Sequence, residues 1–359
     1  MDSTSIIANG ACNFERSLDF ATAGVDSTRA SILACIGNTP MVGLDRVFSG
    51  EHFRLCAKLE GTNPGGSAKD RAALSMLSSA LRSGEIYPDT TIIESSSGNM
   101  GIGLAQACCY FRLPFICVVD MKTTAQNVSI LRAYGAKIDM ISTPDPVTGE
   151  FLQARLNRVR ALRESIPNSW WVNQYSNGYA AAAYHSMMDE IVRQLGGAPD
   201  YLFCATGTCG TLRGCADYIR NHALKTKIWA VDAVGSVIFG DKRQKRLLPG
   251  HGSACVPALF MPGLAERCIH VTDKDCILGC RKLLREEAIL VGGSSGAIIA
   301  AIEQVREEIE RGAVCVAILA DRGERYLDTV YSDDWVRENF GNVVVELAQQ
   351  TPRPCISSL

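Results

Sequence analysis

The sequence contains no run of 18 or more apolar residues, the length at which a helix becomes a candidate to cross a bilayer. It also lacks an excess of either charge, because 36 Lys and Arg residues face 38 Asp and Glu residues and leave a net charge of -2. We therefore expect neither a membrane nor nucleic acid as a partner. A length of 359 residues, 47% of them hydrophobic, is ample for two domains.

Metal-binding patterns are scarce as well. There is no C-x-x-C pair and there are only five histidines, so we expect no metal site. The 15 cysteines lie mostly within apolar stretches such as "QACCYF", "FICVVD" and "AVCVAIL", where a reduced thiol behaves as a small hydrophobic side chain. Reduced thiols predict a cytoplasmic protein, because disulfides persist mainly in oxidising compartments.

Two nucleotide-binding fingerprints are absent. The P-loop pattern G-x-x-x-x-G-K-[ST] does not occur, which argues against a P-loop nucleotidase. The turn "SSSGNMGIG" has the glycine order G-x-x-G-x-G instead of the dinucleotide fingerprint G-x-G-x-x-G, which disfavours a nicotinamide-dependent dehydrogenase.

Short apolar segments alternate with helical patterns along most of the chain. The segments that indicate buried strands are residues 54–60, 91–95, 114–120, 137–142, 201–206, 227–233 and 314–320. Helical patterns lie between them, at residues 69–82, 101–111, 125–134, 179–195, 211–222 and 276–287. This alternation predicts an α/β fold with parallel sheets and helices on both faces. Ligands bind such sheets beyond the carboxyl ends of the strands.

The segment "NPGGSAKDRA" places a lysine after a glycine turn. Gly65 and Gly66 allow a sharp turn, and Ser67 and Asp70 have the S-x-x-D spacing of a capping box. Lys69 is therefore expected in the first turn of a helix, where the helix dipole disfavours a cation and so favours a nucleophilic amine. From these residues alone, a reactive amine and an exposed lysine without a chemical role both stay open.

Three further turns are rich in Gly, Ser and Thr: "ESSSGNMG", "CATGTCGT" and "VGGSSGA". The first two follow predicted strands and could direct backbone N–H groups at an anion, while the third is also typical of close helix packing. Each could be a structural turn. Together with the lysine they suit pyridoxal phosphate, which needs an amine, a phosphate anchor and a partner for its pyridine nitrogen.

These segments make the sequence resemble the cysteine-synthase family of pyridoxal-phosphate enzymes. The resemblance runs in order through "IGNTPMVGL", "AKLEGTNPGGSAKDR", "SSSGNMG", "VNQYSN", "GTCGT", "VGGSSGA" and "ADRGERYLDT". It implies a homodimer with the tryptophan-synthase-β-like fold of type II, built from two open-sheet, three-layer α/β/α domains. The implied parts are a smaller, mobile substrate-binding domain at 63–173, a larger cofactor-binding domain at 31–62 and 174–340, a flexible tail at 1–30 and a second tail at 341–359.

The resemblance also implies roles for individual residues. Lys69 matches the Schiff-base lysine, Asn99 the asparagine that bonds the 3′-oxygen of the cofactor, and Ser294 the partner of the pyridine nitrogen. The implied phosphate loop consists of Gly207, Thr208, Cys209, Gly210 and Thr211. The implied holders of the substrate carboxylate are Ser96, Ser97 and Gln174.

Within the family, the sequence looks most like the N-(2-amino-2-carboxyethyl)-L-glutamate synthases, in "DAVGSVIFGDK", "LGCRKLL" and "DRGERYLDTVYSDDW". Met100 supports this branch, since ordinary cysteine synthases usually have threonine there. The likeness implies that O-phospho-L-serine and L-glutamate are joined with release of phosphate, giving a 2,3-diaminopropionate precursor for siderophores. Cys209 and Gly207 depart from the branch pattern, which bears on recognition of the donor.

A phosphate leaving group needs a cation, and we expect Arg155 to supply it together with Tyr175; a charged helix face is the alternative for Arg155. Other functions stay open. They are a cysteine synthase that uses sulfide, a threonine or serine dehydratase, and a non-catalytic scaffold subunit. The intact set of Lys69, Asn99 and Ser294 argues against a scaffold, which would have no need of all three.

Overall fold

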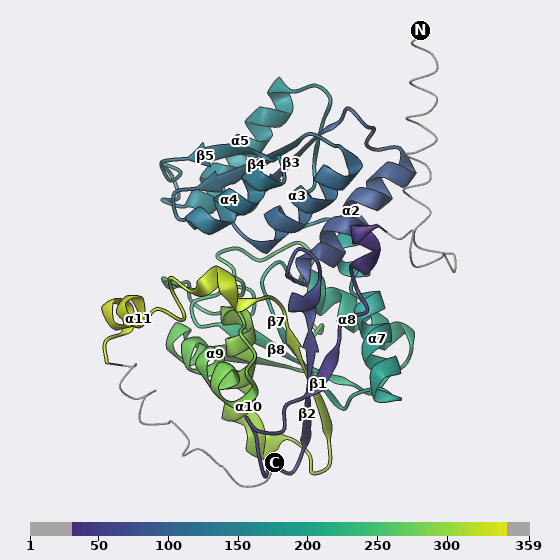
Figure 1. The fold of residues 1–359 in the computed structure, drawn as a ribbon, viewed down its shortest axis with the longest axis vertical. Helices are drawn as coiled ribbons and strands as arrows, with labels where there is room; N and C mark the ends of the chain where they lie inside the picture. Colours follow the sequence, from purple (N-terminus) through teal and green to yellow (C-terminus); the bar gives the residue numbers. More distant parts are fainter. Residues whose placement is uncertain (1–30, 343–359) are drawn as a thin grey trace.

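The computed structural model describes residues 31–342, so the tail predicted at 1–30 and, apart from its first two residues, the tail predicted at 341–359 lie outside the described residues. Two open sheets with helices on both faces lie one above the other (Figure 1). This arrangement confirms the predicted α/β class with two three-layer domains. Within the described range, no helix combines the length and the apolar composition that crossing a bilayer requires.

The smaller sheet has four parallel strands in the order β5-β4-β3-β6. Their bounds are β3 Thr91–Ser95, β4 Phe115–Asp120, β5 Lys137–Ile141 and β6 Ser169–Trp171. One face packs on α5, because Val159 and Leu162 of that helix join Ile93, Ile116 and Val118 in a small apolar cluster. The helices of this part of the chain are α2 Lys69–Ser83, α3 Asn99–Phe111, α4 Ala125–Ala133 and α5 Phe151–Ser165.

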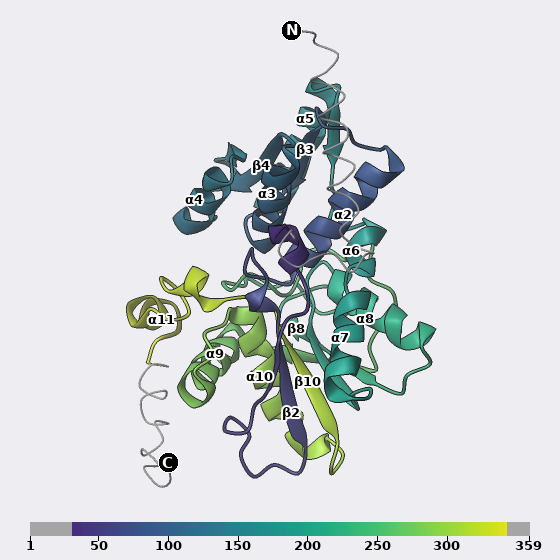
Figure 2. The ribbon, with the colours of Figure 1, turned by 45° about the vertical axis from the view of Figure 1, so that its right-hand side comes forward.

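The larger sheet has six strands in the order β1-β2-β10-β7-β8-β9, and every pair except β1 with β2 is parallel. The strands are β1 Met41–Gly43, β2 Arg54–Leu59, β7 Tyr201–Ala205, β8 Lys227–Ala233, β9 Arg267–Val271 and β10 Val314–Leu319. Helices α7 and α8 cover one face, while α9 and α10 cover the other (Figure 2). The helices are α6 Gly178–Ala182, α7 His185–Leu195, α8 Gly210–Asn221, α9 Asp273–Glu287, α10 Gly293–Val305 and α11 Asp333–Phe340.

All seven predicted strands are present, but the sequence patterns missed β1, β6 and β9. The first two have only three residues each, and β9 mixes polar with apolar side chains at the sheet edge. The helix predicted at residues 179–195 is wrong in one respect, because it is broken into α6 and α7. The break lies beside Tyr184, which is buried and donates its hydroxyl hydrogen to the carbonyl of Ala68 at 3.2 Å.

A buried charge network fixes the start of α2 to the larger sheet. The Arg71 guanidinium donates to Glu60 at 2.7 and 2.8 Å and to Glu190 on α7 at 2.7 and 2.8 Å. Lys58 on β2 also donates to Glu190, at 2.7 Å. All four side chains are buried, so each charge is held by its partners and not by water.

Helices α9 and α10 approach so closely that only glycine fits where they cross. A Cβ atom on Gly279 would lie 2.1 Å from the carbonyl oxygen of Gly296, and a Cβ atom on Gly296 would lie 2.1 Å from the carbonyl oxygen of Cys276. The segment "VGGSSGA" therefore serves helix packing through Gly296, as one of its two sequence readings suggested.

Substituting Gly279→Ala should lower the free energy of unfolding by about 1–3 kcal/mol, the usual effect of forcing an extra methyl group into a packed core. The measurement is urea unfolding followed by circular dichroism. Gly197→Ala is the matched control, because a Cβ atom there meets nothing within 4 Å and the backbone is not left-handed. Equal unfolding midpoints for the two variants would contradict the packing argument.

Candidate active site

One cavity lies at the junction of the two sheets, beyond the carboxyl ends of β3, β7 and β10. Residues of these strand ends, Ser95, Ala205 and Ile318, line it directly. All thirteen residues singled out from the sequence also line it: Lys69, Ser96, Ser97, Asn99, Arg155, Gln174, Tyr175, Gly207, Thr208, Cys209, Gly210, Thr211 and Ser294. Segments that are distant in the sequence therefore meet at one place, as expected for open parallel sheets.

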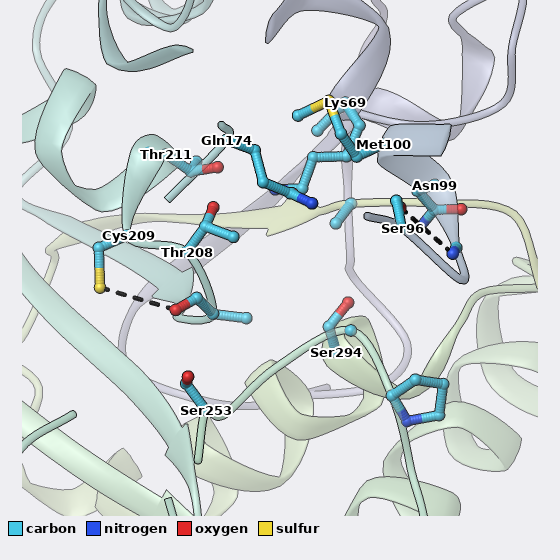
Figure 3. A pocket seen from close by; sticks show the side chains of 18 of the residues that line it. Lys69, Ser96, Asn99, Met100, Gln174, Thr208, Cys209, Thr211, Ser253 and Ser294 are labelled. Atoms are coloured by element: carbon cyan, nitrogen blue, oxygen red, sulfur yellow. Dashed lines mark hydrogen bonds between the residues drawn. The ribbon is translucent and has the colours of Figure 1, made fainter. Parts of the chain in front are cut away.

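Lys69 enters the cavity from the first residue of α2 (Figure 3). The predicted capping box is only partly formed. The Asp70 carboxylate reaches back to accept the N–H of Gly65 at 2.6 Å, but the Ser67 hydroxyl accepts from the N–H of Lys69 at 3.2 Å and the helix N-cap is Ala68. The glycine is required by this contact, because a Cβ atom on Gly65 would lie 2.6 Å from the Asp70 carboxylate.

The turn before α3 brings Ser96 and Asn99 to the cavity. The Ser96 hydroxyl accepts the backbone N–H of Gly101 at 2.9 Å, which satisfies one of the unpaired donors of the first helical turn. The Asn99 amide donates to Asp321 at 2.7 Å and accepts from Arg325. An amide nitrogen carries two hydrogens, so one N–H of Asn99 stays available for a ligand.

The turn from Gly207 to Thr211 precedes α8, and the hydroxyls of Thr208 and Thr211 lie on its cavity side (Figure 3). The first N–H groups of a helix have no partner within the helix, which makes this turn a ready anion site. Cys209 is left-handed, with a φ of 63°, a conformation that favours glycine. Burial raises the pKa of its thiol to about 12, so the thiol is neutral and adds no negative charge to the anion site.

Across the cavity from this turn lies Ser294, in the first turn of α10 (Figure 3). Ser294 is 4% exposed and neighbours the loop between β8 and β9. That loop contributes Pro249, Gly250, Gly252 and Ser253 to the cavity. A Cβ atom on Gly250 would meet Ser294 at 3.7 Å. The small residues of "PGHGS" could have indicated that this loop belongs to a ligand site, but no predicted strand directly precedes them.

The donor set fits pyridoxal phosphate. An amine (Lys69), an anion cradle before α8 and a hydroxyl (Ser294) line the same cavity from different sides. The cradle is open, since a Cβ atom on Gly207 would have its nearest neighbour 3.6 Å away, at the carbonyl oxygen of Gly250. An aldehyde, a phosphate and a pyridine nitrogen each find a partner of suitable chemistry here.

Arg155 reaches the cavity from α5. Its Nε lies 3.3 Å from the carboxylate of Asp120, and its buried Nη1 has no hydrogen-bond partner among the described residues. Tyr175 lies close enough for the Arg155 charge to act on its hydroxyl, although burial dominates and raises the Tyr175 pKa to about 12. A neutral phenol next to a partly unpaired guanidinium forms a second site for an anion in the cavity.

Gln174 is held beside a carboxyl group that the sequence patterns missed. Glu94, at the end of β3, accepts the backbone N–H of Gln174 at 3.4 Å and that of Ser95 at 2.9 Å. Complete burial raises the Glu94 pKa to about 7, against the effect of these hydrogen bonds. The Gln174 amide donates to the carbonyl of Ser95 at 3.3 Å, which directs its side chain along the wall of the cavity.

Comparison with known proteins agrees with this chemistry. A family described as pyridoxal-phosphate dependent enzyme matches residues 32–321. An N-(2-amino-2-carboxyethyl)-L-glutamate synthase from Ralstonia nicotianae is 44% identical over 307 residues, which cover 85% of this chain and 90% of the relative.

Solved structures similar to this chain include two enzymes named for serine derivatives. An O-acetylserine-dependent cystathionine β-synthase from Helicobacter pylori is 30% identical, with a TM-score of 0.78 over 86% of this chain and 100% of the other. An O-ureido-L-serine synthase is 29% identical, with a TM-score of 0.77 over 85% of this chain and 97% of the other.

Replacing Lys69→Ala should abolish covalent retention of pyridoxal phosphate, because Lys69 is the lysine that lines the cavity within residues 31–342. The measurement is the visible absorbance of the bound cofactor after dialysis. Lys137→Ala is the control, since Lys137 is an exposed residue on β5 and should leave the absorbance unchanged. A yellow Lys69→Ala protein that keeps its cofactor through dialysis would refute this role.

Proposed function

The chain belongs to the family of pyridoxal-phosphate dependent enzymes, and from this premise we propose that it replaces the phosphate of O-phospho-L-serine by the amino group of L-glutamate. In this β-replacement the Cβ–O bond breaks and a Cβ–N bond forms. Phosphate leaves with the electron pair, and the glutamate amine loses a proton. The product is N-(2-amino-2-carboxyethyl)-L-glutamate.

Lys69 moves the proton. The bound cofactor supplies an electron sink that makes the Cα proton of the donor acidic. With the donor bound, the amine of Lys69 would be the group that takes the Cα proton, as a positioned general base. The network around Arg71 holds the start of α2 in place, so the amine acts from a fixed point.

The Ser294 hydroxyl, which lines the cavity, would be the partner of the pyridine nitrogen of the cofactor. A hydroxyl does not protonate this nitrogen as a carboxylic acid would, which limits the negative charge that can build up at Cα. That limit favours loss of the β-substituent over transamination or racemisation. One N–H of Asn99 remains for the 3′-oxygen of the cofactor, because Asp321 and Arg325 occupy the rest of its amide.

The substrate carboxylate is held by Ser96, Ser97 and Gln174. The Ser96 hydroxyl accepts from Gly101, which leaves its own hydrogen free to donate to a carboxylate. The N-terminus of α3 adds the positive end of a helix dipole at the same point. These groups fix the donor so that its Cα hydrogen faces the amine of Lys69.

The single observation that carries the choice of donor is the buried, unpartnered Nη1 of Arg155 in the cavity. A guanidinium with a free N–H stabilises a departing phosphate more than a departing acetate, because the phosphate carries the larger negative charge. The likeness to the Ralstonia synthase supports glutamate as the nucleophile. On the same basis the product is a 2,3-diaminopropionate precursor for a siderophore.

The cellular setting is part of the same proposal. All cysteines within residues 31–342 are free thiols, which supports a cytoplasmic location. The protein forms a homodimer, as its resemblance to the cysteine synthases implies. The smaller sheet with α3, α4 and α5, in the mobile part expected at residues 63–173, closes over the substrate, while α2 stays fixed to the larger sheet through Arg71.

Substituting Arg155→Ala should lower kcat/KM for O-phospho-L-serine roughly ten- to hundredfold, the value of one charge-assisted hydrogen bond of about 1.5–3 kcal/mol. The effect on O-acetyl-L-serine should be small. Arg158→Ala is the matched control on α5, because Arg158 pairs with Asp139 at the surface. An equal loss of kcat/KM with both donors would contradict the assignment of Arg155 to the leaving phosphate.

The nucleophile is tested by mass spectrometry of the products formed from O-phospho-L-serine. With glutamate and sulfide offered together, we expect the glutamate adduct to dominate and to require pyridoxal phosphate. Predominant cysteine would support the second candidate, a cysteine synthase using O-acetyl- or O-phosphoserine. Pyruvate with either nucleophile present would indicate a dehydratase, and any of these outcomes leaves the cofactor site itself intact.

A further inference from the structure

Three side chains with metal-binding chemistry lie on one face of the larger sheet, outside the cavity. Cys268 and His270 are two residues apart on β9, so they point to the same side. Asp232 on β8 is the direct cross-strand partner of His270 and therefore shares that side. None of the three lines the cavity.

The three potential ligand atoms are close together. One atom each of Asp232, Cys268 and His270 lies within 4.8 Å of the other two, and the Cys268 sulfur is 3.9 Å from His270 Nε2. In a filled tetrahedral zinc site, bonds of about 2.0–2.3 Å place the ligand atoms about 3.3–3.8 Å apart. Side-chain movements of about 1 Å or less would close the set around an ion.

An unpaired oxygen points to a missing partner. Asp232 is fully buried, and its Oδ1 accepts the N–H of Ala233 at 2.9 Å. Its Oδ2 has no partner with hydrogen-bond geometry among the described residues, although the hydroxyls of Ser236 and Thr206 act on the carboxylate and lower its pKa against the larger effect of burial. Arg246, a cation of the neighbouring loop, donates instead to the carbonyl of His251 at 2.9 Å. A buried carboxylate oxygen without a partner is costly, and a bound cation would remove that cost.

A fourth ligand is available from the loop that follows β8. The Asp241 carboxylate lies 3.5 Å from His270 Nε2 and is about half exposed, with 47% of its side chain accessible. Either this oxygen or a water molecule can complete a tetrahedron. The site is reachable from solvent, since Cys268 and His270 are only partly buried.

We propose that Asp232, Cys268 and His270 bind a zinc ion. The mixed sulfur, nitrogen and oxygen donors favour a borderline-soft divalent ion and disfavour magnesium and calcium, which prefer all-oxygen sites. The ion links β9, the last strand of the sheet, to β8. β8 in turn carries the turn before α8, because Val231 accepts the N–H of Thr206 at 2.9 Å.

The test is metal analysis of the tag-free, full-length holoenzyme after loading with zinc chloride and dialysis against metal-free buffer. We expect about one retained zinc per chain, and at least about a tenfold weaker affinity in Cys268→Ser and in His270→Ala, since even outer-shell changes cost that much. Cobalt loading should give a thiolate charge-transfer band that Cys268→Ser removes. Controls are Cys109→Ser, an exposed thiol on α3, and His222→Gln beyond α8.

A second measurement needs no variant. Zinc should slow alkylation of Cys268 by iodoacetamide in the wild-type holoenzyme, read by peptide mass spectrometry, while the alkylation rate of Cys109 stays unchanged. The proposal is overturned if dialysis leaves no zinc on the wild-type protein. It is also overturned if zinc does not alter the alkylation of Cys268, or if the controls lose zinc as much as the cluster variants.

Discussion

The position from which the Lys69 side chain enters the cavity depends on the buried charge of Arg71, two residues further along α2. Arg71 is held by two carboxylates, Glu60 and Glu190, through four hydrogen bonds of 2.7–2.8 Å. Removing one member would leave an uncompensated buried charge, which typically costs about 3–5 kcal/mol. This network therefore fixes α2 on the larger sheet, and it gives the reactive amine one position at the junction of the two sheets.

The rest of the site depends on that junction. The cradle before α8 and the hydroxyl of Ser294 belong to the larger sheet, whereas Ser96 and Asn99 follow a strand of the smaller one. Asn99 is tied across the junction to Asp321 and Arg325. Substrate and cofactor would thus be held from both sheets at once, and any movement of the smaller sheet would change the carboxylate site before the phosphate cradle.

Much of this could be predicted from the sequence, because local patterns encode strands and the turns that follow them. The seven apolar strands and the Gly-, Ser- and Thr-rich turns at the cavity are of this kind, whereas the roles of single cavity residues came from the resemblance to the cysteine-synthase family. Short or mixed strands such as β6 and β9 carry too few residues for a pattern. The break between α6 and α7 lies beside Tyr184, whose hydroxyl donates to Ala68 far away in the chain, and no local signal encodes that contact. The cluster around Asp232 was missed for the same reason, since it exists only through the register of β8 and β9.

The role of the glycines also became clear only in three dimensions. From the sequence, Gly65 was expected only to allow a sharp turn, but glycine is required there because the Asp70 carboxylate occupies the space of a side chain. The most direct test of the central claim is a crystal structure of the protein grown with pyridoxal phosphate. We expect continuous density between Lys69 Nζ and the cofactor, with its phosphate at the turn from Gly207 to Thr211. Density joining the cofactor to another lysine, or a phosphate bound elsewhere, would contradict it.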